Sequence, residues 1–346
     1  MSRKILWSHP ITAPDDLALP SGFELIWRER ELSAAFARKY SRLGNISEYL
    51  LRFYVALTIL KRRRKFDAIV TGRYGELFAL FQGLWPFGRR PLVLLDVEWY
   101  SSHGSGWRAA LSRWLHHRMS KGAARIQVFC RVEAGNYARR FNVPEERFVW
   151  IPYCTSLPDG TGQDSVREET ERSFAFSGGL HHRDYKTLFS AIEDLPLELH
   201  VAAPREAVEN LAVPSNVRLL GVIPPADYWR ELRASQMVIL SLEPNHTRCP
   251  GVITYVAAMA RGKCVVVNEP AGSPDYIDDG HTGFIVPSSD PAALRALVAA
   301  LLADPERMRA VGERAGIAAA RRFSAAAYYE AVQLVTSAVG SPERGS

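Results

Sequence analysis

The sequence has few cysteines, no long hydrophobic run and no signal-peptide pattern. Its four cysteines form neither a CxxC pair nor a zinc spacing, which is typical of unpaired thiols in a reducing compartment; they are Cys130, Cys154, Cys249 and Cys264. No apolar run approaches the roughly 18 to 20 residues of a membrane span. The start, MSRKILWSHP, lacks an apolar stretch that ends in a cleavage site. We therefore expect a cytoplasmic protein and leave open a peripheral association with the inner face of the membrane.

Two protein classes are disfavoured by motifs that the sequence lacks. No G-x-G-x-x-G follows a candidate strand, which argues against a nicotinamide-dependent dehydrogenase. The pI of about 9.2 would suit a nucleic-acid-binding protein. However, the chain has no recognition helix, zinc finger or aromatic strand pair of the RNA-binding kind, so we expect no nucleic-acid partner. We also expect no metal and no cofactor, since only Asp96 and Glu98, in DVE, come near a carboxylate pair.

Charge is divided unevenly along the chain. Residues 1–150 hold 25 Lys and Arg against 13 Asp and Glu, whereas residues 151–346 hold 18 against 24. The first part also contains all but one of the eight tryptophans. A basic, tryptophan-rich half joined to an acidic half favours an anionic partner for the first half.

The length of 346 residues predicts two domains. Short apolar runs alternate with longer amphipathic ones, as in parallel sheets with crossover helices. Residues 153–172 are polar and rich in Gly, Pro and Asp, as in a linker. We predict an α/β chain with two Rossmann-like, doubly wound domains, 1–155 and 160–325, that face each other across a ligand-binding cleft. A C-terminal helix at 325–340 is free to pack back on the first domain.

Candidate strands and helix starts follow from local patterns. Asn45 and Glu48 suit the start of a helix over NISEYLLRFYVALTILKRRRK, in which apolar residues recur at helical spacing from Ile46 to Leu60. Asp290 and Pro291 suit the start of DPAALRALVAALLA. The candidate strands are KILWS, FELIW, AIVTG, LVLLD and IQVFC in the first half, and SFAFS, LELHVAA, VRLLG, MVILSL, KCVVVN and GFIVP in the second.

The stretch SGGLHHRDYKTLFSAI follows one of these strands and predicts an anion-binding turn. A glycine pair, Gly178 and Gly179, lets backbone N–H groups approach an anion at the positive end of a helix. Arg183, at the expected start of that helix, adds a permanent cation. Many strand–helix turns carry glycine for steric reasons alone, so the turn by itself is a weak signal.

Further motifs in the second half resemble the C-terminal domain of glycosyltransferase family 4 in the GT-B fold class. The matching features are AAMARGK, the strand CVVV, a Gly/Pro turn, DYIDDGHTGFIVP and the helix that begins at DPAAL. FSGGLHHRDYKTLFSAI is similar to the phosphate-binding turn of that family, and NVRLLGVIPPADYWRELRASQMVIL to its nucleobase segment. The resemblance covers residues 174–325 strongly and the first half only by strand order.

The resemblance implies a hexosyltransferase-type enzyme that uses a nucleotide sugar, most simply a UDP- or GDP-sugar, in the assembly of a polysaccharide, lipopolysaccharide or glycolipid. It implies retaining, metal-independent transfer to a hydroxyl of a glycan or lipid-linked acceptor. Arg183 would stabilise the leaving diphosphate, with Lys186 as a second candidate. The donor would also contact Gly178 and Gly179 (diphosphate), Gly251, Val252 and Ile253 (phosphates, through N–H groups that open a helix), and Gly221 and Val222 (base).

The chain departs from the family pattern at two glutamates that normally lie eight positions apart. Cys249 and Ala257 occupy these positions, and neither can hold ribose hydroxyls through a charge-assisted hydrogen bond. Glu243, in LSLEPN, is a nearby candidate substitute. The departure also leaves open an alternative, a nucleotide-sugar-binding pseudoenzyme or assembly partner of the same fold.

The acceptor side has weaker candidates. His103 and Glu98, in LLDVEWYSSHGSG, follow a strand and are candidate catalytic groups; a loop histidine and a capping carboxylate are equally ordinary readings. Arg73, in TGRYGE, and His9 follow other strands and are candidates for the same region. In WRAALSRWLHHRM, an apolar stripe beside arginines fits either a helix on an anionic membrane or, as we prefer, a helix packed on the sheet.

Overall fold

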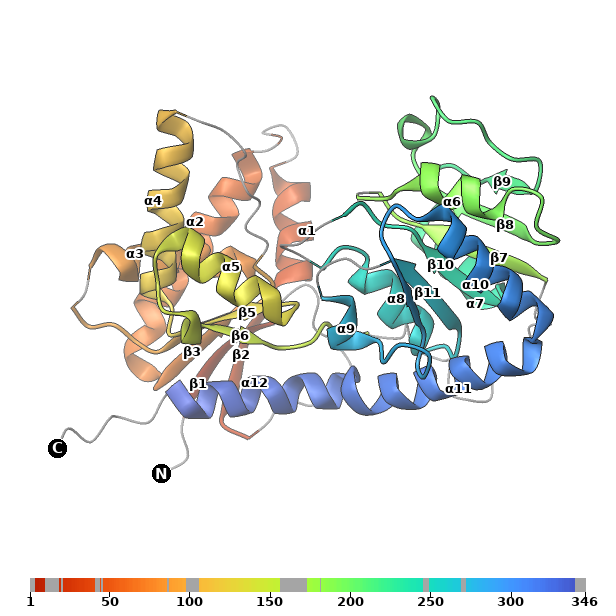
Figure 1. The fold of residues 1–346 in the computed structure, drawn as a ribbon. Coiled ribbons are helices and arrows are strands. Elements are labelled where there is room, and N and C mark those ends of the chain that lie inside the picture. The colour runs from red at the N-terminus through yellow and green to blue at the C-terminus, as the bar shows by residue number, and fades with distance from the viewer. Residues whose placement is uncertain are drawn as a thin grey trace. The chain divides into compact units, whose positions relative to one another are not determined.

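A computed structural model gives the fold, and it divides the chain into two compact units (Figure 1). The first comprises residues 1–152 and 325–346, and the second comprises residues 153–324. The structure describes residues 4–9, 19, 21–40, 44, 46–85, 87–97, 106–155, 173–180, 182–244, 249–268 and 272–339.

The first unit contains a six-stranded parallel sheet with the order β2-β1-β3-β4-β5-β6. Its strands are β1 (Ile5–His9), β2 (Phe23–Arg28), β3 (Ala68–Thr71), β4 (Leu92–Leu94), β5 (Arg125–Val128) and β6 (Phe148–Trp150). Its α-helices are α1 (Glu29–Lys39), α2 (Ile46–Arg62), α3 (Glu76–Leu84), α4 (Trp107–Gly122), α5 (Arg131–Phe141) and α12 (Ala325–Val339). Short 3₁₀ helices lie at η2 (Arg63–Lys65), η3 (Arg73–Gly75) and η4 (Glu145–Arg147). The C-terminal helix α12 contacts β3.

The second unit contains another six-stranded parallel sheet, with the order β12-β11-β10-β7-β8-β9. Its strands are β7 (Phe174–Gly178), β8 (Glu198–Ala202), β9 (Val217–Leu219), β10 (Met237–Leu240), β11 (Cys264–Asn268) and β12 (Phe284–Val286). Its helices are α6 (Tyr185–Ile192), α7 (Pro225–Ala234), α8 (Val252–Met259), α9 (Ser273–Tyr276), α10 (Pro291–Ala303) and α11 (Pro305–Arg322), with the 3₁₀ helix η6 (Arg205–Ala207).

Parallel strands that are covered on both faces need continuous apolar runs, and the central strands have them. Every residue of β3, β4, β10 and β11 is buried. Each sheet reverses its strand order once, between β1 and β3 in the first unit and between β7 and β10 in the second. In open α/β sheets, ligands bind outside the carboxyl ends of the strands at such switch points. We therefore expect ligands to bind at the carboxyl ends of these four strands.

The predicted α/β class with two parallel-sheet Rossmann-like domains is confirmed, and the runs quoted above supply eleven of the twelve strands that the structure describes. The strand β6, Phe148–Trp150, was not among the predicted strands. The predicted start of α10 is also correct, since the Asp290 carboxylate accepts a hydrogen bond of 2.9 Å from the Ala293 N–H. Asn45 lies outside the described residues.

Two predicted helices bury different residues from those expected. In α4, the stripe that we expected to pack on the sheet is exposed: Trp107 is 71 % and Leu111 47 % exposed. The helix instead packs through small residues, since the Cβ that an alanine would add at Gly122 would lie 1.8 Å from the Ala79 carbonyl oxygen on α3. In α2, the residues that are buried are Leu51, Val55 and Ile59, on the side opposite the Ile46–Leu60 stripe.

Candidate functional site

The switch point of the second sheet is built by three backbone segments. β7 ends at Gly178, and the following turn returns to the end of β10, where Arg183 forms an isolated bridge with Leu242. The Asp184 N–H donates to the Ser241 carbonyl at 3.0 Å. These contacts fix Arg183 between the carboxyl ends of β7 and β10, the position at which a doubly wound sheet binds its ligand.

The Arg183 side chain folds back over the glycine pair. Its Nε and Nη2 donate to the Gly178 carbonyl at 3.0 and 2.9 Å. A Cβ at Gly179 would lie 2.1 Å from Nη2, and the φ of Gly179 is +141°. Only glycine fits such a backbone in contact with the guanidinium. The Gly179 N–H donates to the Ala202 carbonyl at 3.1 Å, so it is not the free N–H group that we predicted for an anion. The glycine instead lets the arginine lie against the turn.

The helix after this turn begins later than predicted. Asp184, not a glycine, is the N-cap of α6: its carboxylate accepts from the Thr187 N–H at 3.0 Å and from the Thr187 hydroxyl at 2.6 Å. Arg183 thus precedes the helix and belongs to the turn. The helix begins after Asp184 because the aspartate carboxylate accepts a hydrogen bond from an N–H group of the first turn.

A second glycine corner meets the same guanidinium. Gly251 is the N-cap of α8, with a φ of +78°. A Cβ at Gly251 would lie 3.7 Å from Nη1 of Arg183 and 3.2 Å from the Leu242 side chain. Val252 and Ile253 are the first residues of α8, so their N–H groups have no carbonyl to reach within the helix. The two glycine corners predicted to hold a diphosphate therefore lie together around Arg183.

Two tyrosines that the sequence did not single out complete this cluster. The Tyr228 ring, from α7, packs against Gly178, because a Cβ added at Gly178 would lie 2.5 Å from Cε2 of Tyr228. The Tyr228 hydroxyl is 3.0 Å from the Thr254 hydroxyl. The Tyr185 hydroxyl donates to the Gly179 carbonyl at 3.2 Å. Burial raises the pKa of Tyr185 to about 12 and also raises that of Tyr228. Both hydroxyls therefore keep their protons at neutral pH.

Burial also lowers the pKa of Arg183, against the opposing effect of the two tyrosine hydroxyls. A guanidinium stays protonated in proteins despite such a shift. Removing a cation from water weakens its solvation and strengthens its attraction to an anion. Arg183 is thus placed to attract a negatively charged group.

The other predicted donor residues lie around this cluster with fewer contacts. The Glu243 carboxylate is 3.0 Å from Nδ1 of His182. Lys186 is exposed on α6. Gly221 and Val222 lie in the turn between β9 and α7, and Val222 is 69 % exposed. None of these contacts tests the predicted roles.

The positions where the family carries glutamates are apolar and enclosed. Ala257 is 3 % exposed and lies in the buried face of α8. Cys249 is 7 % exposed, and its Sγ is 2.7 Å from the Tyr255 hydroxyl. The α8 helix therefore packs here as a hydrophobic element.

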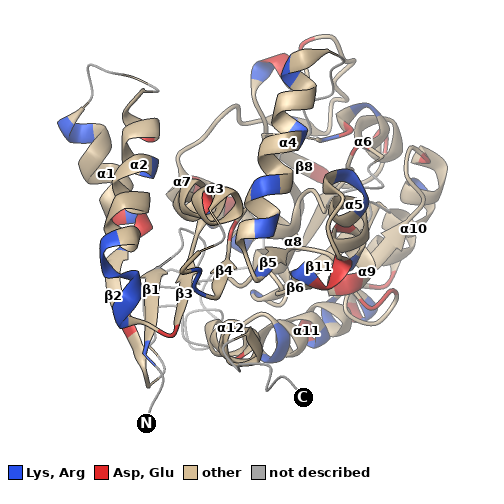
Figure 2. Cartoon of the chain, turned by 90° about the vertical axis from the view of Figure 1, so that its left-hand side faces the viewer, with Lys and Arg blue, Asp and Glu red and all other residues tan. Residues whose placement is uncertain are grey.

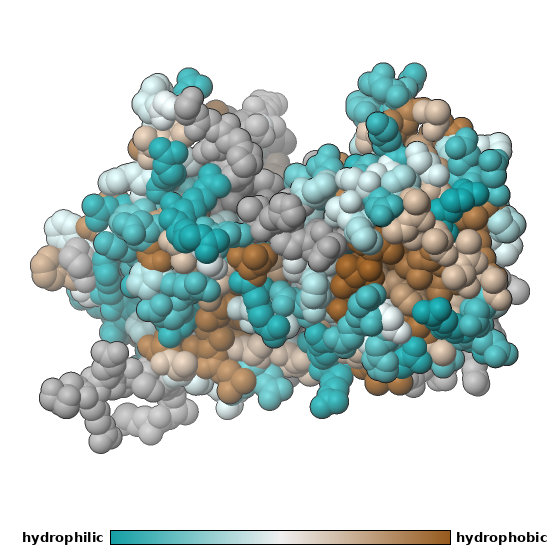
Figure 3. Space-filling model, in the orientation of Figure 1, coloured by the Kyte–Doolittle hydropathy of each residue, from teal (hydrophilic) through white to brown (hydrophobic). Residues whose placement is uncertain are grey.

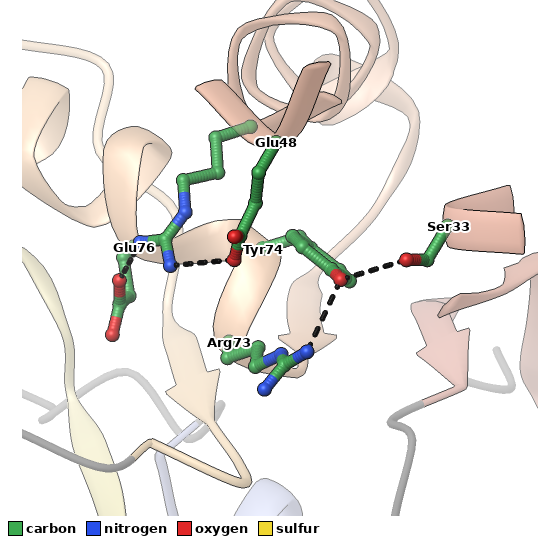
Figure 4. A network of polar contacts seen from close by, with 6 residues as sticks. Ser33, Glu48, Arg73, Tyr74 and Glu76 are labelled. Atoms are coloured by element: carbon green, nitrogen blue, oxygen red, sulfur yellow. Dashed lines mark hydrogen bonds and ion pairs between the residues drawn. The ribbon is translucent and has the colours of Figure 1, made fainter. Parts of the chain in front are cut away.

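Of the acceptor-side candidates, Arg73 can be placed in most detail. It lies in η3, directly after β3, and its Nη2 donates to the Tyr74 hydroxyl at 3.3 Å (Figure 4). That hydroxyl donates to Ser33 at 3.0 Å, which ties η3 to α1. His103 and Glu98 lie outside the described residues. His9 ends β1, and its side chain is not described.

The switch point of the first sheet holds a buried carboxyl group that sequence reasoning missed. Glu29, the first residue of α1, accepts at Oε1 from the Ser8 hydroxyl at 2.7 Å and the Gly72 N–H at 2.9 Å. Among the described residues, no hydrogen-bond partner reaches its Oε2. Burial raises the pKa of Glu29 to about 7, and Asp96 raises it further against the hydrogen bonds. The only available signal, a glutamate after a candidate strand, is too common to identify such a group.

Two features are absent from the described residues. No cluster of three or more His, Cys, Asp or Glu in these ranges could hold a metal ion. None of the helices described is long and apolar enough to cross a bilayer.

Comparison with known proteins shows which family the second unit resembles. Residues 165–316 match the family model "Glycosyl transferases group 1". A D-inositol 3-phosphate glycosyltransferase of Segniliparus rotundus is 39 % identical over 116 residues, 34 % of this chain and 25 % of that protein. A GDP-mannose-dependent alpha-(1-6)-phosphatidylinositol monomannoside mannosyltransferase of Mycolicibacterium smegmatis is 42 % identical over 75 residues, 20 % of each chain. The aligned segments thus span a quarter or less of these two relatives.

Similarity of fold extends over both units. HepE of Anabaena, crystallised with UDP and glucose, superposes with a TM-score of 0.62 at 13 % identity, covering 97 % of this chain and 100 % of HepE. At this identity the likeness concerns the fold alone. Residues 165–316 are thus similar to the glycosyl transferases group 1 family, and the two units together have the GT-B fold.

Proposed function

We propose that this protein transfers a hexose from a nucleotide sugar to a hydroxyl of a glycan or lipid-linked acceptor, in the assembly of a polysaccharide, lipopolysaccharide or glycolipid. The observation that carries the proposal is the meeting of two glycine corners, Gly178–Gly179 and Gly251, on the half-buried guanidinium of Arg183. The N–H groups at the N-terminus of α8 and a partly desolvated cation together suit a diphosphate.

The reaction requires stabilisation of the leaving nucleoside diphosphate. Negative charge grows on the phosphate nearest the sugar as the glycosidic bond breaks, and preorganised donors lower the barrier most where charge develops. Arg183 is the residue proposed to supply this stabilisation, with the N–H groups of Val252 and Ile253 beside it. We propose that transfer needs no metal and retains the configuration of the transferred sugar.

The similar proteins support a nucleotide-sugar donor without settling its base. HepE was crystallised with UDP, whereas the name of the mannosyltransferase specifies GDP-mannose. We propose a UDP- or GDP-sugar as the donor. Glu243, at the rim of the cluster, is the proposed ligand of the ribose hydroxyls.

A thermal-shift screen against UDP-, GDP- and ADP-sugars tests donor binding, because a ligand that binds only the folded state raises its apparent stability. We expect stabilisation by one nucleotide class, abolished in Arg183→Ala and retained in Lys186→Ala. Transfer is measured as release of nucleotide that depends on an added acceptor, with and without a chelator. Absence of stabilisation by any of the three classes would overturn the proposal.

A nucleotide-sugar-binding pseudoenzyme is the second candidate, because Cys249 and Ala257 replace the paired glutamates. It predicts stabilisation by a nucleotide sugar without release of free sugar or transfer to any acceptor. Donor hydrolysis by the wild-type protein, lost in Arg183→Ala, would exclude this candidate.

A further inference from the structure

Helix α2 has two apolar faces, of which only one contacts the core. Leu51, Val55 and Ile59 are at most 2 % exposed and belong to the core of the first unit. With 3.6 residues per turn, the stripe on the opposite side of the helix points away from this core. Its residues are 39 to 72 % exposed: Ile46, Tyr49, Leu50, Phe53 and Leu57.

Single exposed apolar residues are ordinary, and hydrophobic side chains reach the surface among hydrophilic ones in the view of Figure 3. The α2 stripe differs because it is continuous over about three turns of one helix. A surface helix normally has a polar outer face, and a contiguous apolar patch marks a binding surface.

The stripe continues into a pocket between α2 and α3. The pocket has a volume of about 530 Å³ and is lined by Leu60, Lys61, Arg63, Arg64, Phe81 and Trp85. Beside it, Trp85 and Phe87 are 61 and 74 % exposed, and their ring centroids lie 6.2 Å apart. Arg63 reaches toward this aromatic pair, since its Nη2 is 3.6 Å from where a Cβ on Gly88 would be.

Positive charge is concentrated at the same end of α2. Residues 46–65 contain six Lys and Arg and a single acidic residue, Glu48. Glu48 lies near the opposite end of α2, where its carboxylate is 3.3 Å from the Arg52 guanidinium. The five consecutive cations 61–65 are therefore not neutralised by acidic residues of their own segment. Basic residues also recur along α4 (Figure 2).

We propose that this α2–α3 surface, formed by the stripe, the pocket and the Trp85–Phe87 pair, docks on an anionic membrane. Aromatic rings favour the boundary between headgroups and acyl chains, where an amphipathic helix lies in the membrane plane. Lys and Arg beside such a helix are attracted to anionic headgroups. The inference rests on the proposed function in one respect: a membrane would present the lipid-linked acceptor of the transfer reaction.

Two other occupants fit the charges and the side chains less well. A second copy in a two-fold interface would present the same patch, so the cations of both copies would be buried close together. Nucleic acid would engage the cations through phosphates, but Ile46, Leu50 and Leu57 would have no apolar layer to enter. A membrane accounts for both the cations and the aliphatic residues.

Sedimentation of the full chain with vesicles tests the proposal without donor or acceptor. Vesicles of phosphatidylcholine alone are compared with vesicles that also contain phosphatidylglycerol, each at low and high salt. We expect binding to the anionic vesicles that weakens with salt. Tyr49→Ser/Phe53→Ser should reduce the partition coefficient about tenfold or more. Arg63→Glu/Arg64→Glu should reduce it similarly and remove the preference for anionic lipid.

Matched controls separate the surface from general charge and hydrophobicity. Ile317→Ser/Leu334→Ser removes two apolar side chains that are 71 and 66 % exposed elsewhere, and Arg309→Glu/Arg321→Glu makes the same charge change on α11. Both should bind vesicles as the wild type does.

Any of three results would overturn the inference. The wild-type protein could stay in the supernatant with anionic vesicles, or the stripe variant could bind them as strongly as the wild type does. Light scattering could also show a dimer that depends on the stripe, in a protein that does not bind vesicles. Nucleotide-induced thermal shifts, measured in parallel, report on the proposed transfer reaction. Loss of vesicle binding with an intact thermal shift therefore defeats only the docking proposal.

Discussion

In each sheet, a notable ionisable side chain lies at the switch point of the strand order: a base in the second unit and an acid in the first. In the second unit, Arg183 lies between the ends of β7 and β10, against two glycine corners. In the first unit, Glu29 lies at the ends of β1 and β3, bonded to Ser8 and Gly72. The same topology thus places a half-buried cation in one unit and a buried acid in the other.

Burial has different consequences for the two groups. Arg183 keeps its charge despite a lowered pKa, so its desolvation increases its attraction for an anion. Glu29 responds by holding its proton to higher pH, with a pKa of about 7. A partly desolvated arginine therefore suits charge stabilisation, whereas the buried glutamic acid makes the first unit sensitive to pH.

The largest expected effect comes from removing the cation. Arg183→Ala should lower the transfer rate roughly 10²- to 10³-fold, the usual loss for one donor to a developing oxyanion. The control is Lys186→Ala, which removes an exposed cation three residues away and should change the rate less than about threefold. Equal losses of rate in the two variants would show that Arg183 does not stabilise the leaving group more than an exposed cation does, and would contradict the proposed role of Arg183.

The acid in the first unit should limit stability at neutral pH. A carboxyl whose folded pKa is about 7 and whose ordinary value is 4.5 stays protonated in the folded state after the unfolded chain has ionised. Below pH 4.5 this carboxyl does not lower the free energy of unfolding, because it is protonated in both states. As the pH rises from 4.5 to about 7, the free energy of unfolding falls by ~3 kcal/mol. Glu29→Gln should remove that part of the pH dependence and raise stability at pH 8.

Urea unfolding of Glu29→Gln across this pH range measures the difference. Glu31→Gln, with an exposed side chain on the same helix, is the matched control and should follow the wild type. A Glu29→Gln protein with the unchanged wild-type slope would show that this carboxyl is not the buried acid described.

The fit of Arg183 to its glycine corner is testable with a smaller change. Gly179→Ala would push the guanidinium from the Gly178 carbonyl and strain a backbone at positive φ, at about 1–3 kcal/mol. We expect both lower stability and weaker nucleotide-induced stabilisation. Gly280→Ala, at a φ of +72° with open space around its Cβ, should lower stability alone. Similar nucleotide responses in both variants would argue against the displacement of Arg183.

The smallest expected effect concerns the Tyr228 hydroxyl. Tyr228→Phe removes the contact with Thr254 but retains the ring beside Gly178, so it should cost about 1 kcal/mol of stability. Thr254→Val tests the same contact from its other side. The two losses should fall short of additive in the double variant if the hydroxyls bond each other.

Local patterns account for most of the fold and for part of the candidate site. Apolar runs such as CVVVN predict buried parallel strands, and glycines at strand–helix turns predict anion-binding corners, because both depend on neighbouring residues alone. Tyr228 and Glu29 gave no such signal, since their roles depend on contacts with residues distant in the sequence. The exposed face of α2 was also unpredictable, because two apolar stripes compete for the core and spacing cannot rank them.

The sequence by itself determined the succession of strands, helices and glycine turns, since backbone conformation and side-chain periodicity act over a few residues. Tertiary structure alone decided that Gly179, Arg183 and Gly251 meet, because the strand order places β7 beside β10 and brings segments some seventy residues apart to one edge of the sheet. It likewise decided which ionisable groups lose contact with water, and their pKa values follow from that burial.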